Sequence, residues 1–444
     1  MRSFFQDFVE DDDGNIIRCK MHDIVHDFVL YLTKDECFTV VVKGAKERME
    51  LPGDEVRHLT LLFAPEGPFP VSLLNNSKSL RTLTSFDSQL TSIGIEGFSQ
   101  LKCLRTLHLR SNPITEVPKE IGGLIHLRYL DLSDNRELNE LPDSLCNLYN
   151  LQTLRLKECS NLVKLPKEEA MRKLTNLKHL YVELCCNLKS KGIRGLRNLK
   201  TLDVFHVHGG DDSEGLRLED LEKLHQLEGT LRIRNLKNVK DANAKLEETT
   251  LDEEIVNALQ PHPDLESLRI EGYSAKTLCP NWMMSLHKLT RLALVNCRNC
   301  EVLPPLGKLP SLESLEIYWM DEVKKVGVEF LGIAPSSSSS SSGSAILFPK
   351  LKKLVFSLMS SWEEWEGVAG WTEDSQIKIM PSLKYLGFEY VPKLKTLPDF
   401  LRKTPLQHLV IRDNSPHLES IVKQRSGEEW AKISHIPNIQ QVGR

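Results

Sequence analysis

The chain has 444 residues, of which 40% are hydrophobic and 27% charged, a composition that is ordinary for a folded soluble protein. Its formal net charge of −4 gives no reason to expect binding to nucleic acid or to an anionic membrane, and no apolar run reaches the roughly 18 residues that would span a bilayer. The chain starts with one arginine followed by acidic residues, unlike a signal peptide, so we expect a cytoplasmic protein.

The sequence of residues 1–45 is typical of the C-terminal end of a small domain. The segment RSFFQDF, residues 2–8, is compatible with a short helix, and Asp13-Gly14 predicts the turn of a hairpin. A second helix is predicted over residues 21–32, because one face gathers apolar residues at helical spacing: Met21, Ile24, Val25, Phe28, Val29 and Leu32. Helix, hairpin and helix in this order predict part of a winged-helix fold.

The start of this second helix carries two histidines one helical turn apart. The order His22-Asp23-x-x-His26 differs by one methylene from the H-E-x-x-H pattern of zinc proteases. A zinc hydrolase is therefore one hypothesis, although Asp23 would reach a bound water poorly and no third ligand can be identified. Alternatively, both histidines are surface residues beside the apolar helix face.

A leucine pattern, L-x-x-L-x-x-L-x-L, fills most of the remaining chain. It occurs, for example, as LKCLRTLHL (101–109), LIHLRYLDL (124–132) and LPSLESLEI (309–317). Successive copies start mostly about 22 to 26 residues apart, which is the period of leucine-rich repeats. The pattern predicts an α/β solenoid, with a curved parallel sheet and an irregular convex side, over residues 79–414. Residues 46–78 would form a linker and first repeat, and residues 415–444 a C-terminal cap.

Three positions after the last strand leucine, each repeat is expected to carry an Asn or Cys that bonds to backbone in the adjacent turn. The residues at these ladder positions are Asn112, Asn135, Cys159, Cys185, Cys297 and Asn414. This role accounts for several of the ten cysteines, which do not predict a disulfide framework. Cys297 and Cys300 form a C-x-x-C pair, but we expect no metal site because structural zinc needs four ligands.

Three segments interrupt the repeat. Residues 208–260 contain a predicted loop and a stretch compatible with helix, and residues 333–345 contain a serine run that predicts a disordered loop. Residues 360–379 hold three tryptophans, Trp362, Trp365 and Trp371. Packing within an enlarged convex loop is favoured for them over a binding patch.

The residues between the strand leucines are expected to line the concave face of the sheet, because alternate residues of a strand point to opposite sides. Arginines and aromatic residues there suit a protein partner. The candidate protein-binding residues are His108, Arg110, Arg155, Lys157, Phe205, Arg232, Arg234, Arg269 and Tyr318.

Several phrases resemble plant intracellular immune receptors of the nucleotide-binding, leucine-rich-repeat type, coiled-coil class. They are DGNIIRCKMHDIVHDF (13–28), RHLTLL (57–62), LQPHPDLESLRIEGY (259–273) and GEEWAKISHIPNI (427–439). Met21-His22-Asp23 resembles the Met-His-Asp motif that ends the family's nucleotide-binding module. The resemblance implies that His22 faces nucleotide phosphates and that Asp23 holds the motif in place. No G-x-x-x-x-G-K-[ST] loop occurs, so ADP or ATP is expected only with a complete nucleotide-binding module.

The resemblance implies an innate immune receptor fragment whose repeats recognise a pathogen effector or a modified host protein and regulate activation. Its expected partners are that protein and, within the receptor, the nucleotide-binding domain, with no enzyme activity, nucleic acid or membrane span. A stand-alone repeat scaffold is the alternative, and the zinc hydrolase using His22 and His26 is the third hypothesis.

Overall fold

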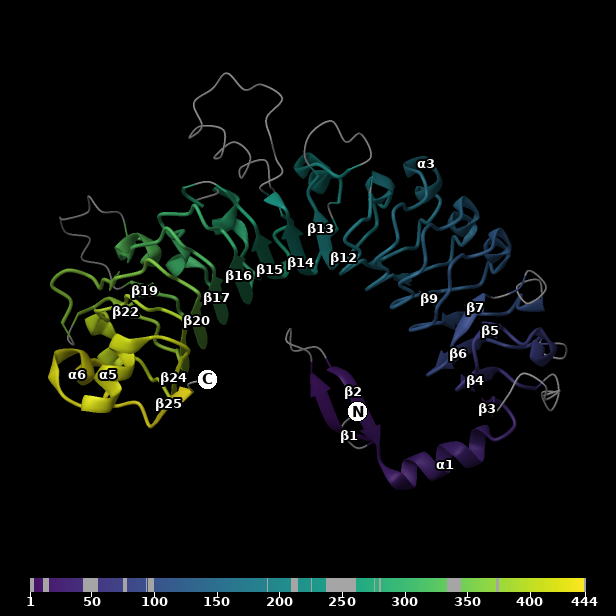
Figure 1. Cartoon of the computed structure of the whole chain (residues 1–444), viewed down its shortest axis with the longest axis horizontal. Helices are drawn as coiled ribbons and strands as arrows, with labels where there is room; N and C mark the ends of the chain where they lie inside the picture. Colours follow the sequence, from purple (N-terminus) through teal and green to yellow (C-terminus); the bar gives the residue numbers. More distant parts are fainter. Residues whose placement is uncertain are drawn as a thin grey trace, which may run out of the picture. The chain divides into compact units, whose positions relative to one another are not determined.

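The computed structural model forms two compact units, residues 1–203 and 204–444, each built on a parallel sheet (Figure 1). We call them unit 1 and unit 2. The structure describes residues 4–10, 16–42, 55–74, 78–92, 94, 100–189, 191–208, 215–224, 226–236, 261–274, 276–278, 281–333, 345–372 and 375–442.

Unit 1 begins with a hairpin and a helix. Strand β1 (Phe5–Glu10) pairs antiparallel with β2 (Ile16–Met21), and helix α1 (Asp23–Thr33) follows directly. The predicted hairpin and second helix are confirmed, but the short helix predicted over residues 2–8 is wrong. Phe4, Phe5, Phe8 and Val9 fit a helical period as well as a strand, and pairing with β2 decides the outcome.

The sheet of unit 1 has eight described strands, all parallel, and each comes from one repeat or from the segment before the first. In sheet order they are β3 (Cys37–Val41), β4 (His58–Leu62), β6 (Thr82–Phe86), β8 (Thr106–His108), β9 (Tyr129–Asp131), β10 (Thr153–Arg155), β11 (His179–Tyr181) and β12 (Thr201–Leu202).

The sheet of unit 2 has nine described strands and is also parallel. They are β13 (Val204–His206), β14 (Gly229–Arg234), β15 (Leu265–Glu271), β16 (Arg291–Val295), β17 (Ser314–Tyr318), β20 (Lys353–Ser357), β23 (Tyr385–Glu389), β24 (His408–Arg412) and β25 (Asn438–Val442). Helices α5 (Pro416–Gln424) and α6 (Gly427–Ile433) precede β25, so the segment predicted as a cap adds a strand to the sheet.

The convex sides carry short elements, as expected for the irregular convex side that the leucine pattern predicts. Pro118, Pro142 and Pro398 each stand just before a 3-10 helix, where a residue without an amide donor is tolerated. These elements are η1 (Val71–Leu74), η2 (Lys119–Gly123), η3 (Asp143–Asn147), α3 (Glu168–Met171), η4 (Lys191–Gly195), η5 (Leu218–Lys223), η7 (Asn281–Ser285), η8 (Leu306–Lys308), η9 (Val328–Leu331) and η10 (Asp399–Lys403). Two-stranded pairs join β5 (Gly67–Pro68) with β7 (Leu90–Ser92), β18 (Lys325–Val326) with β21 (Glu364–Trp365), and β19 (Ile346–Leu347) with β22 (Lys378–Ile379).

Leucines in register form the core of each unit. In unit 1, a row of five leucines from adjacent strands is fully buried: Leu107, Leu130, Leu154, Leu180 and Leu202. Burying one such side chain contributes roughly 1.5–3 kcal/mol, so no single repeat could form its core without its neighbours.

The predicted Asn and Cys ladder is present, with one exception. Cys159 and Cys185 donate to the carbonyl groups of Leu132 and Leu156, at 3.1 and 2.9 Å. Burial raises the pKa of the Cys159 thiol to about 12, so it stays protonated at neutral pH and can donate. Asn414 is exposed and Ser415 is buried in its place, because two left-handed residues, Asp413 and Asn414, shift the turn by one position.

The sheet is not continuous from residue 79 to 412, as the sequence pattern alone suggests. Within the described ranges, β12 pairs with β11 and ends at Leu202, whereas β13 starts at Val204 and pairs with β14. Most of the predicted loop (residues 209–214), the stretch compatible with helix (residues 237–260) and the serine run (residues 334–344) lie outside the described residues.

Candidate functional site

The Met-His-Asp segment lies at the junction of β2 and α1. His22 is the N-cap residue of α1, and its backbone N–H donates to Phe4 at 3.0 Å. The side chains of His22, Asp23 and His26 are exposed, and Nδ1 of His26 lies 3.4 Å from a carboxylate oxygen of Asp27. Across the described part of the chain, no group of three or more His, Cys, Asp or Glu side chains could hold a metal ion.

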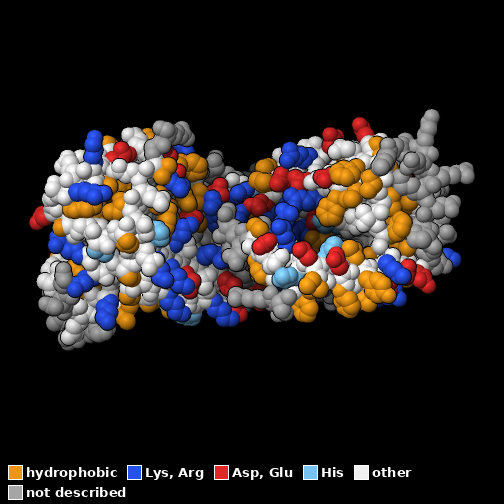
Figure 2. Space-filling view, turned by 90° about the horizontal axis from the view of Figure 1, so that it is seen from below, with side chains coloured by type: hydrophobic (Ala, Val, Ile, Leu, Met, Phe, Trp, Pro, Cys, Tyr) orange, Lys and Arg blue, Asp and Glu red, His pale blue; other side chains and the backbone are white. Residues whose placement is uncertain are grey.

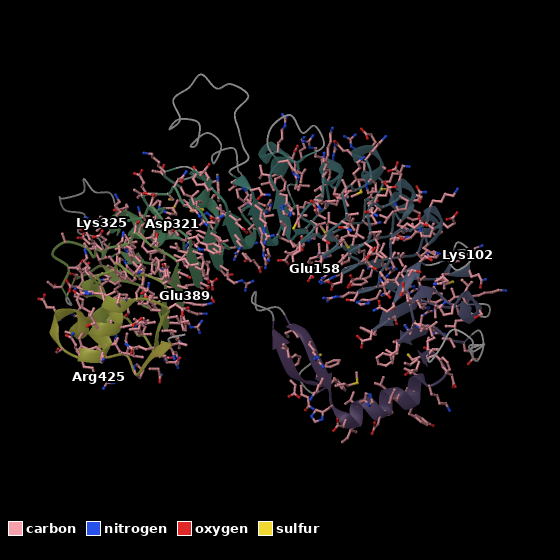
Figure 3. All side chains as sticks on the ribbon, in the orientation of Figure 1. Lys102, Glu158, Asp321, Lys325, Glu389 and Arg425 are labelled. Atoms are coloured by element: carbon pink, nitrogen blue, oxygen red, sulfur yellow. The ribbon has the colours of Figure 1, made fainter. Side chains whose placement is uncertain are left out.

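Helix α1 has no buried residue. Ile24, Phe28 and Leu32 repeat at one helical turn and are 82%, 61% and 60% exposed. Figure 3 shows the side chains of α1 spreading away from the ribbon. The apolar face that the sequence predicts is therefore present and uncovered in this structure, and such a face is typical of an interaction site.

The concave face of unit 1 is organised around Asp131 on β9, whose side chain is buried. A carboxylate oxygen of Asp131 lies 3.4 Å from Nε2 of His108, 3.5 Å from Nε of Arg155 and 3.2 Å from the hydroxyl of Tyr129. Burial lowers the pKa of His108, and the nearby Asp131 opposes this effect. Two of the predicted residues, His108 and Arg155, are thus held by one carboxylate from the strand between them.

A second cluster continues toward β11 and β12. The guanidinium of Arg155 lies 4.7 Å from the ring centroid of Tyr181, within the range of a cation–π contact. The ammonium of Lys157 lies 3.0 Å from Glu183 and 3.7 Å from Asp203, whose pKa is raised by burial. Every positive side chain of this cluster has a partner, so its conformation is fixed before any ligand binds.

Arg110 lies just beyond the C-terminal end of β8, in the turn that follows the strand. It forms an ion pair of 2.9 Å with Asp134, and Arg136 forms one of 3.1 Å with Glu158, which Figure 3 labels. Both arginine side chains are more than half exposed. Together these residues form a charged edge beside the concave face.

In unit 2, Arg232 and Arg234 on β14 and Arg269 on β15 lie on the concave face as predicted, as does Tyr318 on β17. Glu271 lies 3.1 Å from Nε of Arg234 and 3.8 Å from Nε of Arg269. The Tyr318 hydroxyl donates to Glu316 at 3.1 Å. Figure 2 shows this side of the molecule, with blue Lys and Arg side chains beside red Asp and Glu side chains.

The prediction that Phe205 lies on the concave face is wrong. Phe205 is in register with Ile233, which points into the core, and both side chains are 0% exposed. The leucine phase of the repeat before it places Leu202 and Val204 inward, but the sheet breaks between them and β13 starts a new alternation. His206, two positions from Val204, faces the concave side instead, beside Arg234.

Some residues of the site were not predicted, although a signal was available. Tyr129, Asp131, Tyr181 and Arg291 occupy the same positions between strand leucines as the residues that were selected. Selecting by residue type favoured the cations and missed Asp131, the anion that organises them.

His206 makes the stability of unit 2 depend on pH. Its side chain is 8% exposed, and burial, followed by the charge of Arg234 and then by His208, lowers its pKa from 6.5 to about 4. The unfolded chain therefore binds this proton more tightly, and the stability present above pH 6.5 is lost as the pH falls toward 4. We expect the wild-type chain to lose about 3 kcal/mol more than the His206→Gln variant over this range.

Urea unfolding followed by tryptophan fluorescence measures this effect selectively, because all six tryptophans belong to unit 2: Trp282, Trp319, Trp362, Trp365, Trp371 and Trp430. His58→Gln in unit 1 is the control and should leave the pH profile of this signal unchanged. Parallel pH profiles for the wild type and His206→Gln would contradict the assignment.

The repeating strands, the ladder and the leucine core define a leucine-rich-repeat protein. A family model described as a leucine-rich repeat region matches residues 55–421, and the chain belongs to this family. Among solved structures, a leucine-rich-repeat protein of Leptospira interrogans matches with a TM-score of 0.52 and 20% identity, covering 90% of this chain and 99% of that one. This likeness confirms the predicted fold.

The curated relatives are plant disease resistance proteins, which confirms the predicted resemblance. A putative disease resistance protein of Arabidopsis thaliana is 31% identical over 436 residues, covering 89% of this chain and 29% of the relative. Disease resistance protein RGA2 of Solanum bulbocastanum is 32% identical over 467 residues, covering 100% of this chain and 43% of the relative. The chain thus spans less than half the length of these relatives.

These similarities suggest a non-catalytic receptor or scaffold region. Among the helices that the structure describes, none has the length and apolar character that crossing a bilayer demands.

Proposed function

We propose that this chain is the repeat-bearing part of a plant innate immune receptor in the cytoplasm, and that its concave face recognises a pathogen effector or a modified host protein. The observation that carries the proposal is the network of Asp131, His108, Arg155 and Tyr181 on a leucine-rich-repeat sheet whose relatives are named disease resistance proteins. Arg and Tyr are the residue types that most often dominate the energy of protein interfaces.

The network suits recognition because it is already ordered. Arg155 is held by Asp131 and stacked on Tyr181, and Lys157 is held by Glu183. Fixing a flexible side chain on binding costs roughly 0.5–1.5 kcal/mol, and this cost is reduced when contacts within the free protein already fix it.

Helix α1 suggests a contact within the receptor, between this chain and the nucleotide-binding domain. The exposed apolar face of α1, formed by Ile24, Phe28 and Leu32, would pack against that domain. His22 and Asp23 stand at the start of the same helix, where free backbone N–H groups favour a phosphate. ADP or ATP would bind only in the presence of that domain, and His22 would report it to the repeats.

The test uses a full-length receptor in which this chain replaces the matching part of RGA2. Leaves expressing the wild-type chimera should remain free of spontaneous cell death. Asp23→Val should cause cell death, because it weakens the resting state that depends on bound ADP. His26→Ala is the matched control and should stay silent, because His26 lies one turn further from the helix start.

Equal silence of the Asp23→Val and His26→Ala chimeras would contradict a nucleotide sensor at this position. A stronger effect of His26→Ala than of Asp23→Val would instead favour the hypothesis that His22 and His26 bind a zinc ion. A stand-alone scaffold is the second candidate, because each unit has its own parallel sheet and its own buried leucine core. Neither candidate requires enzyme activity.

A further inference from the structure

Three bulky apolar residues stand next to one another at one edge of the sheet of unit 2. Trp319 follows β17, Leu358 follows β20 and Tyr390 follows β23, and these strands are neighbours. The backbone N–H of Trp319 donates to Ser357 at 3.1 Å, and that of Leu358 donates to Glu389 at 2.8 Å, so each turn is joined to the next repeat. We call Trp319, Leu358 and Tyr390 the apolar row.

The backbone of the apolar row is left-handed, with φ of 56° at Trp319, 56° at Leu358 and 51° at Tyr390. Side chains crowd the backbone in this conformation, which glycine adopts freely and Asn and Asp tolerate better than other residues. The other repeats of unit 2 follow this preference, since the same place after the strand holds Asn235, Gly272, Asn296 and Asp413. The turn itself therefore gives no reason for three bulky side chains.

Packing within unit 2 does not account for the row either. Trp319 is 41% exposed, Tyr390 is 37% exposed, and Leu358 is half-buried. Neither ring contacts another aromatic ring within the described residues. Neighbouring apolar side chains that remain exposed are typical of an interaction site, and Trp and Tyr often dominate the energy of such sites.

An acidic residue with no ion pair to a described residue lies beside the row. Glu389 precedes Tyr390 and is labelled in Figure 3. Its carboxylate accepts a hydrogen bond from Ser357 at 3.1 Å, but Arg412, in register with it on β24, does not form an ion pair with it. By contrast, Glu316 on β17 is paired with Lys353 at 2.6 Å. A partner with a positive side chain next to Tyr390 would complement Glu389.

The row is continuous with the concave face. Val355 and Gly387 are in register on β20 and β23. A Cβ at Gly387 would lie 3.2 Å from Cε1 of Tyr385, so glycine allows this ring to lie close to the sheet. Together with Tyr318, which precedes Trp319, these uncharged residues extend the apolar row onto the face that we propose for recognition.

The spacing of the row fits an α-helix better than an extended segment. Adjacent strands lie about 4.8 Å apart, so the row is about 10 Å long. Two turns of an α-helix rise roughly 11 Å, so a helix lying across the strands would place one side chain per turn against each residue of the row. Alternate side chains of an extended segment are roughly 6.7 Å apart and would miss the row after one step.

We propose that the apolar row binds an amphipathic helix of a partner protein. The helix contributes one aliphatic side chain per turn to the row and, on its flank, a Lys or Arg that pairs with Glu389. The proposal rests on the proposed function, because it names the kind of segment that the concave side of unit 2 would recognise.

The test measures the fluorescence anisotropy of a labelled, alanine-rich helical peptide with one Leu per turn on one face and Lys on the flank of that face. It is added to the purified full chain at about 0.15 M salt, where long-range charge attraction is screened. We expect the wild-type chain to bind this peptide more tightly than a peptide with Gln in place of Leu or with Glu in place of Lys. The Trp319→Asn and Tyr390→Asn double variant should bind at least roughly tenfold more weakly, the effect of about 1.4 kcal/mol of lost interaction.

Phe63→Asn is the matched control, because Phe63 is also left-handed, with φ of 57°, and is 57% exposed, but it belongs to unit 1. This variant should bind like the wild type. The double variant should remain folded, since Asn is the residue that neighbouring repeats use at this place, and circular dichroism during urea unfolding checks this. Glu389→Gln, which can still accept from Ser357, provides a second variant and should weaken binding of the Lys peptide roughly threefold.

No binding by the wild type, or equal binding by the wild type and the double variant, would overturn the proposal. Equal binding of the Leu and Gln peptides would overturn it too, because charge alone would then explain the attraction. Sedimentation that shows a wild-type dimer, lost in the double variant, would assign the row to a second copy of this chain instead. Because no receptor response is measured, failure here would leave the leaf test of the proposed function unaffected.

Discussion

Replacing Trp365 with alanine is expected to lower the free energy of unfolding of unit 2 by about 3–5 kcal/mol. Trp365 is 1% exposed and lies at the centre of an aromatic cluster. Its ring is 5.3 Å from Phe356, 5.8 Å from Trp362 and 5.9 Å from Phe400, measured between centroids. The residues come from several repeats, so the cavity left by alanine would weaken the packing between repeats, and neighbouring side chains could fill it only in part.

Trp365→Phe is the matched control, because the indole Nε1 of Trp365 has no hydrogen-bond partner within the described residues. Phenylalanine keeps most of the ring contacts and removes this unpaired donor, so its cost should be much smaller. Urea unfolding followed by the fluorescence of the remaining tryptophans measures both variants. Similar losses for alanine and phenylalanine would contradict this prediction, because a phenylalanine ring should keep most of the packing in the cluster.

This cluster answers a question that the sequence left open. Three tryptophans among acidic residues fit either packing or a binding patch, and packing was favoured. Trp362 and Trp365 are buried, and Nε1 of Trp362 donates to the carbonyl of Glu364 at 2.8 Å. Trp371 is only half-buried and lines a surface cavity of about 450 Å³ together with Phe400. Sequence alone could not separate these cases, because the contacts come from different repeats.

The strand leucines could be predicted because their period is a local property. Each L-x-L pair fixes both the strand and the side on which its residues lie, so Arg155, Arg232 and Tyr318 were placed correctly. The error at Phe205 arose where the phase changes between Leu202 and Val204, and nothing in the local sequence marks that change. A shift of one residue moves every side chain of that strand to the other face.

The hairpin and helix at residues 4–33 show a different limit of prediction from sequence. Residues 4–10 suit a helix or a strand, and pairing with residues 16–21 selects the strand. The carboxylate of Asp7 lies 3.4 Å from the ammonium of Lys20 across the hairpin. Such long-range pairing overrides local propensity, which is why the hairpin and α1 could be predicted but β1 could not.

Replacing Asn135 with alanine is expected to lower the free energy of unfolding of unit 1 by about 2–4 kcal/mol. Asn135 is fully buried in the ladder. Its amide nitrogen donates to the carbonyl groups of Leu109 and Leu132, at 2.9 and 2.7 Å. Its amide oxygen accepts from the backbone N–H of Ile114 at 3.4 Å. Alanine would leave these backbone groups of two adjacent repeats buried without a side-chain partner.

The chain itself provides the intermediate case, because Cys159 occupies the same ladder position one repeat later. Its thiol donates to Leu132, which also accepts from Asn135. Asn135→Cys should therefore keep one of the bonds and lose less stability than Asn135→Ala. Exposed Asn139→Ala is the control and should change little. Circular dichroism during urea unfolding follows both units, whereas tryptophan fluorescence follows unit 2 alone and should stay constant, so the change in circular dichroism reports unit 1. Equal losses for cysteine and alanine would contradict a hydrogen-bonding role of the ladder, because a thiol that donates at this position should restore part of the stability.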